Sequence, residues 1–133
     1  MIQNRIQAGG FAPVFHSGEW LLAANSHKKG LNDEAALSSL GRHESTDEVF
    51  VLLKGQAVLV LAGKGSEFGP IQAVKLQPDT AYTVEKGEWH AILFEENSSC
   101  LIVENAFSKA GENYTRPLTP AQIKQAQAAI SIL

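Results

Sequence analysis

Two short segments of the sequence carry side chains that can bind a metal ion. Residues 42–55 contain His43 and Glu48, followed by an apolar run that ends at a glycine. Residues 85–90 end with His90. If the fold brings the segments together, two imidazoles and one carboxylate converge on one point, a ligand set that first-row transition metals accept. The sequence therefore predicts a metal site at His43, Glu48 and His90.

The bulk properties of the chain narrow the classes of function. A chain of 133 residues is expected to form one domain, residues 1–133, and is long enough to bury a core without disulfides or a structural metal. The net charge is −3 and the basic residues are not clustered, which argues against nucleic-acid binding. The longest apolar run, residues 57–62, is far too short to span a bilayer, so no membrane association is expected.

Two features favour the cytoplasm as the compartment. The first residues of the chain lack the long apolar stretch of a signal peptide. Cys100 is the only cysteine, so no intrachain disulfide can form.

The sequence between residues 11 and 105 predicts short strands separated by turns. Proline makes the first of them an edge strand or an irregular segment. Residues 34–40 fit a short helix or a strand, and we favour the strand. Residues 41–47 are interpreted as a polar turn, and residues 54–56 as the tight turn of a β-hairpin. The expected strands cover residues 11–16, 19–25, 34–40, 48–53, 57–62, 71–76, 81–84, 89–94 and 100–105.

The C-terminal part of the chain predicts a helix over about residues 120–131. Thr119 is a capping residue, Pro120 occupies the first helical position and Gln122 completes a capping box. Ile123 and Ile130 form a narrow apolar stripe, so we expect the helix to lie on the surface of the barrel or of a partner subunit.

This succession of strands predicts an all-β sandwich or barrel with one added helix. The strand at residues 48–53 is apolar on both of its alternating faces. Both faces must therefore be covered, one by the interior and the other by a second layer or a second subunit. On this ground we expect a homodimer.

The spacing of the site residues resembles that of the cupins, a family of small jelly-roll barrels. His43, four residues, Glu48, six residues and Gly55 match the latter part of the first cupin motif. Gly87, two residues and His90 match the centre of the second motif. The resemblance covers roughly residues 34–105 and implies a jelly-roll (cupin) β-barrel. It also implies that His43, Glu48 and His90 are the metal ligands.

The sequence departs from the cupin pattern at several motif positions. Gly41 stands where the first histidine ligand is expected and cannot bind a metal. Water or substrate could fill that position, or His27 could reach in from the preceding loop. The other departures are Ala35 for the leading glycine, Glu85 for the proline and Phe94 for the closing asparagine.

The resemblance implies a divalent transition metal (Mn, Fe, Ni or Zn) and a small polar ligand such as a sugar derivative or a carboxylic acid. A metal-dependent isomerase, lyase or dioxygenase fits this pattern, but no second carboxylate is placed as a general base, so the reaction type stays open. The alternative is a non-catalytic, metal-free module that binds a sugar or another metabolite. The residues expected to line the pocket, or else to form ordinary core, are Phe50, Tyr82, Ile92 and Phe94.

A purely structural interpretation of the three polar residues also remains. His43 and Glu48 would pair by a hydrogen bond across their turn, and His90 would cap the barrel. A charge at the mouth of an apolar barrel is costly unless it is ligated or hydrogen-bonded, so both interpretations satisfy the same physical requirement.

Overall fold

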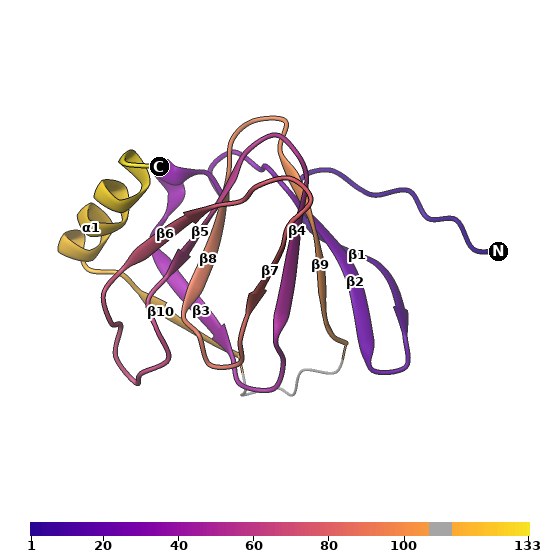
Figure 1. The fold of residues 1–133 in the computed structure, drawn as a ribbon, viewed down its shortest axis with the longest axis horizontal. Helices are drawn as coiled ribbons and strands as arrows, with labels where there is room; N and C mark the ends of the chain where they lie inside the picture. Colours follow the sequence, from indigo (N-terminus) through magenta and orange to yellow (C-terminus); the bar gives the residue numbers. More distant parts are fainter. Residues whose placement is uncertain (107–112) are drawn as a thin grey trace.

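The computed structural model describes residues 1–106 and 113–133 of the chain (Figure 1). Within these ranges the structure contains ten strands, a short 3-10 helix (η1, Glu34–Ala36) and one α-helix (α1, Pro120–Ser131). The strands are β1 (Gly10–Ser17), β2 (Trp20–Ser26), β3 (Ser39–His43), β4 (Glu48–Lys54), β5 (Ala57–Leu61), β6 (Gln72–Lys75), β7 (Ala81–Val84), β8 (His90–Phe94), β9 (Ser99–Asn105) and β10 (Asn113–Pro117).

The strands form two antiparallel sheets that face each other. The first sheet has the order β1-β2-β9-β4-β7 and the second has the order β10-β3-β8-β5-β6. Consecutive strands often belong to different sheets, as in a jelly roll. Side chains from both sheets form the inner core, including Phe50 and Ile102 of the first sheet and Leu59 and Phe94 of the second. The predicted jelly-roll fold is therefore confirmed.

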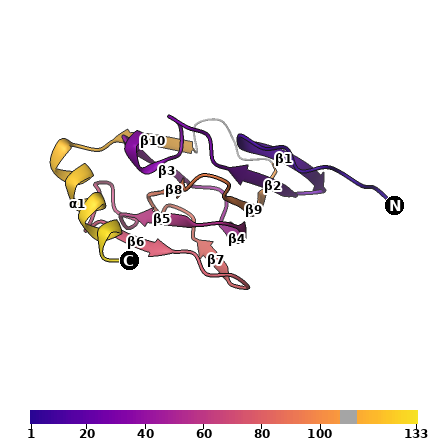
Figure 2. The same ribbon diagram turned by 90° about the horizontal axis from the view of Figure 1, so that it is seen from above.

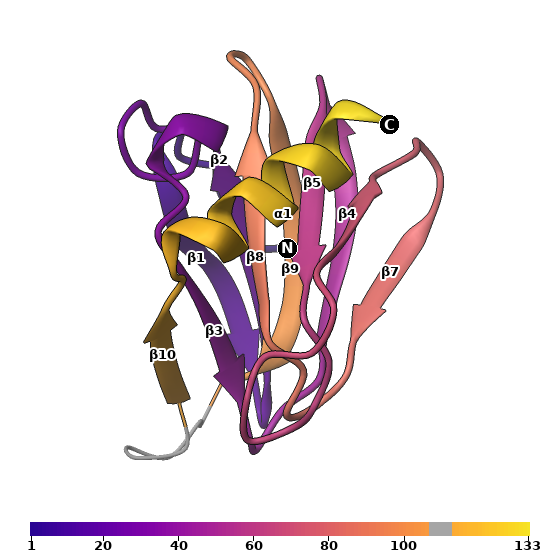
Figure 3. The same ribbon diagram turned by 90° about the vertical axis from the view of Figure 1, so that its left-hand side faces the viewer.

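Helix α1 covers the outer face of the second sheet (Figure 3). Its start is fixed by the predicted capping box, in which Thr119 and Gln122 each accept a backbone N–H of the other. Ala126 of the helix is buried, and Ile123 and Ile130 pack against Val60 and the other apolar side chains of this face. The second sheet is consequently covered on both faces.

Three local predictions were wrong. Residues 34–36 form a 3-10 turn instead of the start of a strand, because the Asp33 side chain accepts the backbone N–H of Ala36 and caps that turn. Residues 41–43 belong to β3 instead of a turn. The turn at residues 54–56 does not close a hairpin, because β4 pairs with β7 and β9 whereas β5 pairs with β6 and β8.

Strand β10 was not predicted, although it pairs with β3 along its whole length.

No helix among residues 1–106 and 113–133 is both long and apolar enough to cross a membrane.

Candidate metal centre

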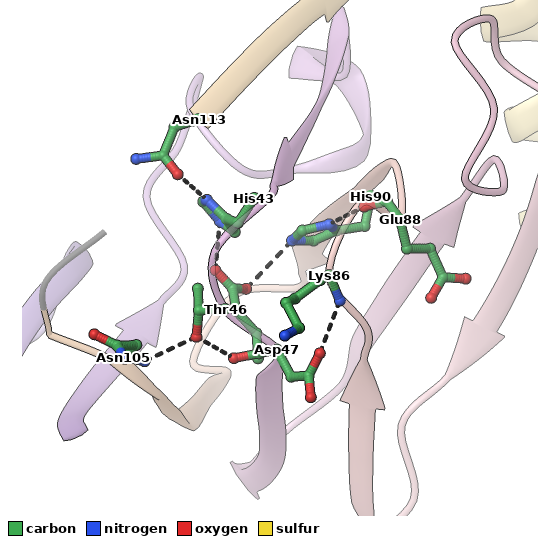
Figure 4. Close-up of polar contacts among 9 residues, drawn as sticks. His43, Thr46, Asp47, Lys86, Glu88, His90, Asn105 and Asn113 are labelled. Atoms are coloured by element: carbon green, nitrogen blue, oxygen red, sulfur yellow. Dashed lines mark hydrogen bonds and ion pairs between the residues drawn. The ribbon is translucent and has the colours of Figure 1, made fainter. Parts of the chain in front are cut away.

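The three predicted ligands converge at one end of the space between the sheets (Figure 4). His43 is the last residue of β3, Glu48 is the first residue of β4 and His90 is the first residue of β8. Because each of them lies at the end of a strand, their side chains meet at the mouth of the barrel. The backbone register pairs Gly41 of β3 with His90 of β8, which holds the two histidine-bearing strands side by side.

The ligand atoms are close enough to share one ion. One atom from each of the three side chains lies within 4.8 Å of the others. The Nε2 atom of His43 is 2.5 Å from Oε1 of Glu48, and the Nε2 atom of His90 is 3.2 Å from Oε2 of the same carboxylate. The Glu48 carboxylate thus contacts both imidazoles, and the dashed lines that run from His43 and His90 to an unlabelled carboxylate in Figure 4 mark these two contacts.

Each imidazole is held from behind by a hydrogen bond at its other nitrogen. The Nδ1 atom of His43 lies 2.6 Å from Oδ1 of Asn113, and the Nδ1 atom of His90 lies 2.8 Å from the carbonyl oxygen of Glu88. Metal-binding histidines are commonly oriented in this way. The arrangement leaves both Nε2 atoms directed at the carboxylate.

The Glu88 carbonyl determines which nitrogen of His90 carries a proton. A carbonyl oxygen only accepts hydrogen bonds, so Nδ1 of His90 must be the donor. In the neutral ring, Nε2 then presents a lone pair to Glu48, whose oxygens are also electron-rich. A cation is needed between these atoms to make the contact favourable, and either a proton or a metal ion can supply it. The donor set of two nitrogens and a carboxylate suits a first-row transition metal.

The electrostatics of the site follow from burial and from these contacts. Burial acts to raise the pKa of Glu48, but its contacts with His43 and His90 outweigh this effect and hold the pKa well below its usual range. The hydrogen bond that His43 donates to Glu48, opposed by burial, raises the pKa of His43 to about 9. Glu48 and His90 are buried, whereas the His43 side chain is 28% exposed, so the site opens to solvent on the His43 side.

Backbone contacts brace the segments that carry the ligands. The N–H of Gly87 donates to the carbonyl of His43 at 2.7 Å. The N–H of Lys86 donates to Oδ1 of Asp47 at 2.8 Å (Figure 4). Gly87 has a φ of +79°, a left-handed conformation that favours glycine. The glycine turn before His90 is therefore tied to both the strand of His43 and the turn that leads to Glu48.

Two residues beside the site were not singled out from the sequence. Glu104 of β9 hydrogen-bonds to Glu48, and burial together with this contact raises the pKa of Glu104 to about 8. The alternation of β9 gave a signal for it, because Cys100 and Ile102 face the core and Glu104 follows with the same parity. Asn113 gave no signal, because its strand was not predicted.

Gly41 stands where the cupin motif has its first histidine ligand, and His27 does not take the place of that ligand. The backbone N–H of His27 donates to the carbonyl of Ser98 at 3.0 Å, which places it at the end of the barrel opposite the site. The suggestion that His27 could reach the metal is therefore wrong. A Cβ at Gly41 would lie 3.3 Å from the backbone oxygen of Tyr114, so β10 packs closely on this part of β3.

The four residues expected to line a pocket lie on the inner side of the barrel. Phe50 and Phe94 belong to the core, and Tyr82 and Ile92 pack against it. The Phe50 ring is 6.1 Å from the His90 ring, centroid to centroid, so it lies directly beneath the site. The Tyr82 hydroxyl accepts the backbone N–H of Gln77 at 2.9 Å.

Comparison with known proteins identifies the fold. Neither a protein-family model nor a curated protein sequence matches the chain. Among solved structures, a cupin 2 domain-containing protein from Halorhodospira halophila is 14% identical, with a TM-score of 0.56 over 95% of this chain and 83% of that one. The chain therefore has the fold of the cupins.

Two further solved structures with this fold carry functional descriptions. A dTDP sugar isomerase from Desulfovibrio desulfuricans is 16% identical, with a TM-score of 0.53 over 80% of this chain and 68% of that one. Cobalt(II) HppE in complex with its substrate is 16% identical, with a TM-score of 0.50 over 72% of this chain. The present chain spans 52% of the HppE chain, about half its length.

Proposed function

We propose that this protein binds one divalent transition metal ion through His43, Glu48 and His90 and acts as an enzyme on a small polar metabolite, such as a sugar derivative or a carboxylic acid. The observation that carries the proposal is the pairing of the buried His90 Nε2 with Glu48 while Nδ1 is committed to a carbonyl. A metal ion held by His43, Glu48 and His90 would supply the positive charge that these side chains require.

The bound metal would supply a Lewis acid that polarises a substrate oxygen. The chain's own residues would orient and surround that substrate. The partly exposed His43 leaves an approach from solvent, and Phe50 forms an apolar surface beneath the ligands. Glu104 places a second carboxyl group beside Glu48, which is what a proton transfer would require. This favours an isomerase or a lyase over a dioxygenase.

Two of the structures with the same fold support the proposal by analogy. One is described as a sugar isomerase and the other as a cobalt(II) protein with bound substrate. Both share the fold with this chain at low identity, so they suggest the class of chemistry and leave the substrate open.

We also propose that the protein is a cytoplasmic homodimer. Cys100 is a buried free thiol, as is common in reducing compartments. The outward side chains of β4 are apolar, which supports a second subunit on that face.

Turnover by the metal-loaded protein tests the function. The protein is stripped with a chelator, reloaded with Mn, Fe, Ni or Zn, and incubated with a panel of nucleotide sugars and small carboxylic acids, while NMR follows product formation. We expect conversion that stops on chelation and is absent in Glu48→Gln. The control variant His16→Ala, which changes an exposed histidine of β1, should keep full activity. Conversion that persists in both the stripped protein and Glu48→Gln would refute a role for the metal.

The second candidate function is a metal-free binding module. It is favoured by the His43–Glu48 contact, because a proton on His43 can supply the cation that the carboxylate requires. A protein that takes up no metal but retains a small ligand during purification would support this candidate.

A further inference from the structure

The residues that directly precede the two candidate histidine ligands contact each other on the outer face of the second sheet. Arg42 precedes His43 in β3, and Trp89 precedes His90 at the start of β8. Neighbouring residues of a strand point to opposite faces of a sheet. The two imidazoles point into the barrel, whereas Trp89 belongs to the apolar cluster on the helix side. The Arg42 guanidinium lies 4.4 Å from the centroid of the Trp89 ring, a cation–π contact.

One backbone carbonyl joins the two side chains. Nη1 of Arg42 donates to the carbonyl of Gly65 at 3.0 Å, and Nε1 of Trp89 donates to the same oxygen at 2.9 Å. Trp89 is 4% exposed and the Arg42 side chain is 18% exposed, so these contacts are largely shielded from water. A planar guanidinium can stack on a ring and donate hydrogen bonds in its plane at the same time. We call Arg42, Trp89 and the Gly65 carbonyl the clamp.

The backbone links the two histidine-bearing strands over a short distance only. Strand β3 lies between β10 and β8 in the second sheet (Figure 2). It pairs with β10 along its whole length, whereas its register with β8 comprises a single pair, Gly41 with His90. One further backbone hydrogen bond runs from Gly87 to the carbonyl of His43. The clamp therefore adds side-chain contacts between these segments where the regular ladder is short.

Trp89 is the fixed half of the clamp. Its backbone N–H donates to the carbonyl of Gly63 at 2.9 Å, and its own carbonyl accepts the N–H of Ala62 at 2.9 Å. Its ring packs edge-on against the ring of Phe68, with the centroids 5.1 Å apart. Because Trp89 is held on these sides, its contact with Arg42 fixes the position of β3 relative to β8.

We propose that Arg42 is a positioning residue, which sets the spacing of the His43 and His90 imidazoles through the clamp and thereby raises the affinity of the site for a metal ion. The affinity part of this inference rests on the proposed function, but the spacing of the rings does not require the ion. The two imidazole rings lie 5.7 Å apart, centroid to centroid. An ion that binds both rings needs both of them in place at once, so a contact that fixes their spacing strengthens binding.

The chain contains a matched control for a purely structural role of Arg42. Arg116 of β10 binds the same loop between β5 and β6, because its Nη1 donates to the carbonyl of Ser66 at 2.8 Å. Its guanidinium also lies 5.6 Å from the centroid of an aromatic ring, that of Phe68. Arg116 does not adjoin a histidine in the sequence. If the two arginines only fasten the loop, their loss should have the same consequences.

Metal competition with a chelating dye tests the effect on affinity. Arg42→Met removes the guanidinium but keeps an apolar stem, and Arg42→Lys keeps the charge without the planar fork. Loss of an outer contact that orients a ligand lowers affinity about 10- to 100-fold, so we expect at least the lower value in Arg42→Met. We expect a smaller loss in Arg42→Lys and none in Arg116→Met.

Circular dichroism establishes that each variant is folded, and Arg42→Lys decides the same comparison if Arg42→Met does not fold. A folded Arg42→Met with wild-type affinity, or an equal loss of affinity in Arg116→Met, would overturn the proposal.

Nuclear Overhauser contacts between the ring protons of His43 and His90 test the clamp in the metal-free protein. We expect these contacts in the wild type and in Arg116→Met, and a several-fold weakening in Arg42→Met. Contacts of unchanged strength in Arg42→Met would overturn the clamp. A wild type that takes up no metal, while its ring contacts are lost in Arg42→Met, would refute the proposed function but support the positioning of the rings by Arg42.

Discussion

The imidazole of His90 and the carboxylate of Glu48 face each other across 3.2 Å in a buried site. The carbonyl of Glu88 fixes the proton of His90 on the far nitrogen, so the near nitrogen and the carboxylate require a cation between them. An uncompensated charge at this depth would cost several kcal/mol. The three polar residues are therefore best understood as one unit whose stability depends on what cation occupies it.

The metal-free protein should lose stability as the pH rises from 6.5 to 9. The His43 pKa is raised from 6.5 to about 9 by Glu48, so the folded state keeps a proton that the unfolded state has released. The stabilisation from this pair is fully present below pH 6.5 and is lost as the pH passes through about 9. Thermal unfolding of the chelator-treated protein measures the effect. The substitution His43→Asn should reduce this pH dependence and leave the part that arises from Glu104, whose pKa is raised to about 8. An equal dependence in the variant and the wild type would contradict the assignment.

Metal affinity should show the opposite trend with pH. A metal ion must displace the proton on His43, so binding releases a proton and tightens as the pH rises. Competition with one proton predicts about a tenfold increase in apparent affinity per pH unit below the His43 pKa of about 9. Calorimetric titrations in buffers of different ionisation enthalpy count the protons released. An affinity that does not change between pH 6.5 and 8 would exclude His43 as a ligand.

Asn113 should influence the affinity of the site for a metal ion, although it is not one of the three predicted ligands. Its Oδ1 atom lies 2.6 Å from Nδ1 of His43 and orients that ring. Loss of such an orienting contact typically lowers metal affinity about 10- to 100-fold. We expect this loss in Asn113→Ala and a smaller one in Asn113→Asp, which retains an oxygen acceptor. Competition with a chelating dye measures both, and equal affinity in Asn113→Ala and wild type would show that the contact is dispensable.

Gly55 should be far less tolerant of a methyl group than Gly63. Both have positive φ, +74° and +76°, so alanine at either position costs about 1–2 kcal/mol of backbone strain. At Gly55 a Cβ would also fall 2.8 Å from Cα of Ser98, whereas at Gly63 it would meet no atom within 4 Å. This clash should add about 1–3 kcal/mol. Urea unfolding compares the two variants, and equal losses of stability would contradict the close approach of Ser98.

Much of the fold could be predicted from local sequence patterns. The alternation in residues 48–53 and 89–94 placed Phe50 and Phe94 inside correctly, because strand parity is a local property. The capping box fixed the start of α1 for the same reason. Strand pairing could not be obtained in this way. The turn around Gly55 has hairpin composition, but it carries the chain from one sheet to the other, which only the packing of the whole barrel determines.

For the candidate site, the sequence predicted the three ligands but not the groups that orient them. The spacing of His43, Glu48 and His90 was sufficient to name the three groups that the structure brings together. The residues that orient them were missed, because Asn113 and the Glu88 carbonyl are neighbours of the ligands only through strand pairing and turn geometry. The sequence contains no local signal for either contact.

Elemental analysis tests the central claim that His43, Glu48 and His90 form a metal site. Tag-free wild type, His90→Ala and the control His16→Ala are stripped, reloaded with one transition metal at a time and freed of excess ion. We predict close to one metal ion per chain in the wild type and in His16→Ala, and almost none in His90→Ala. No retained metal in the wild type, or equal metal in His90→Ala, would contradict the account.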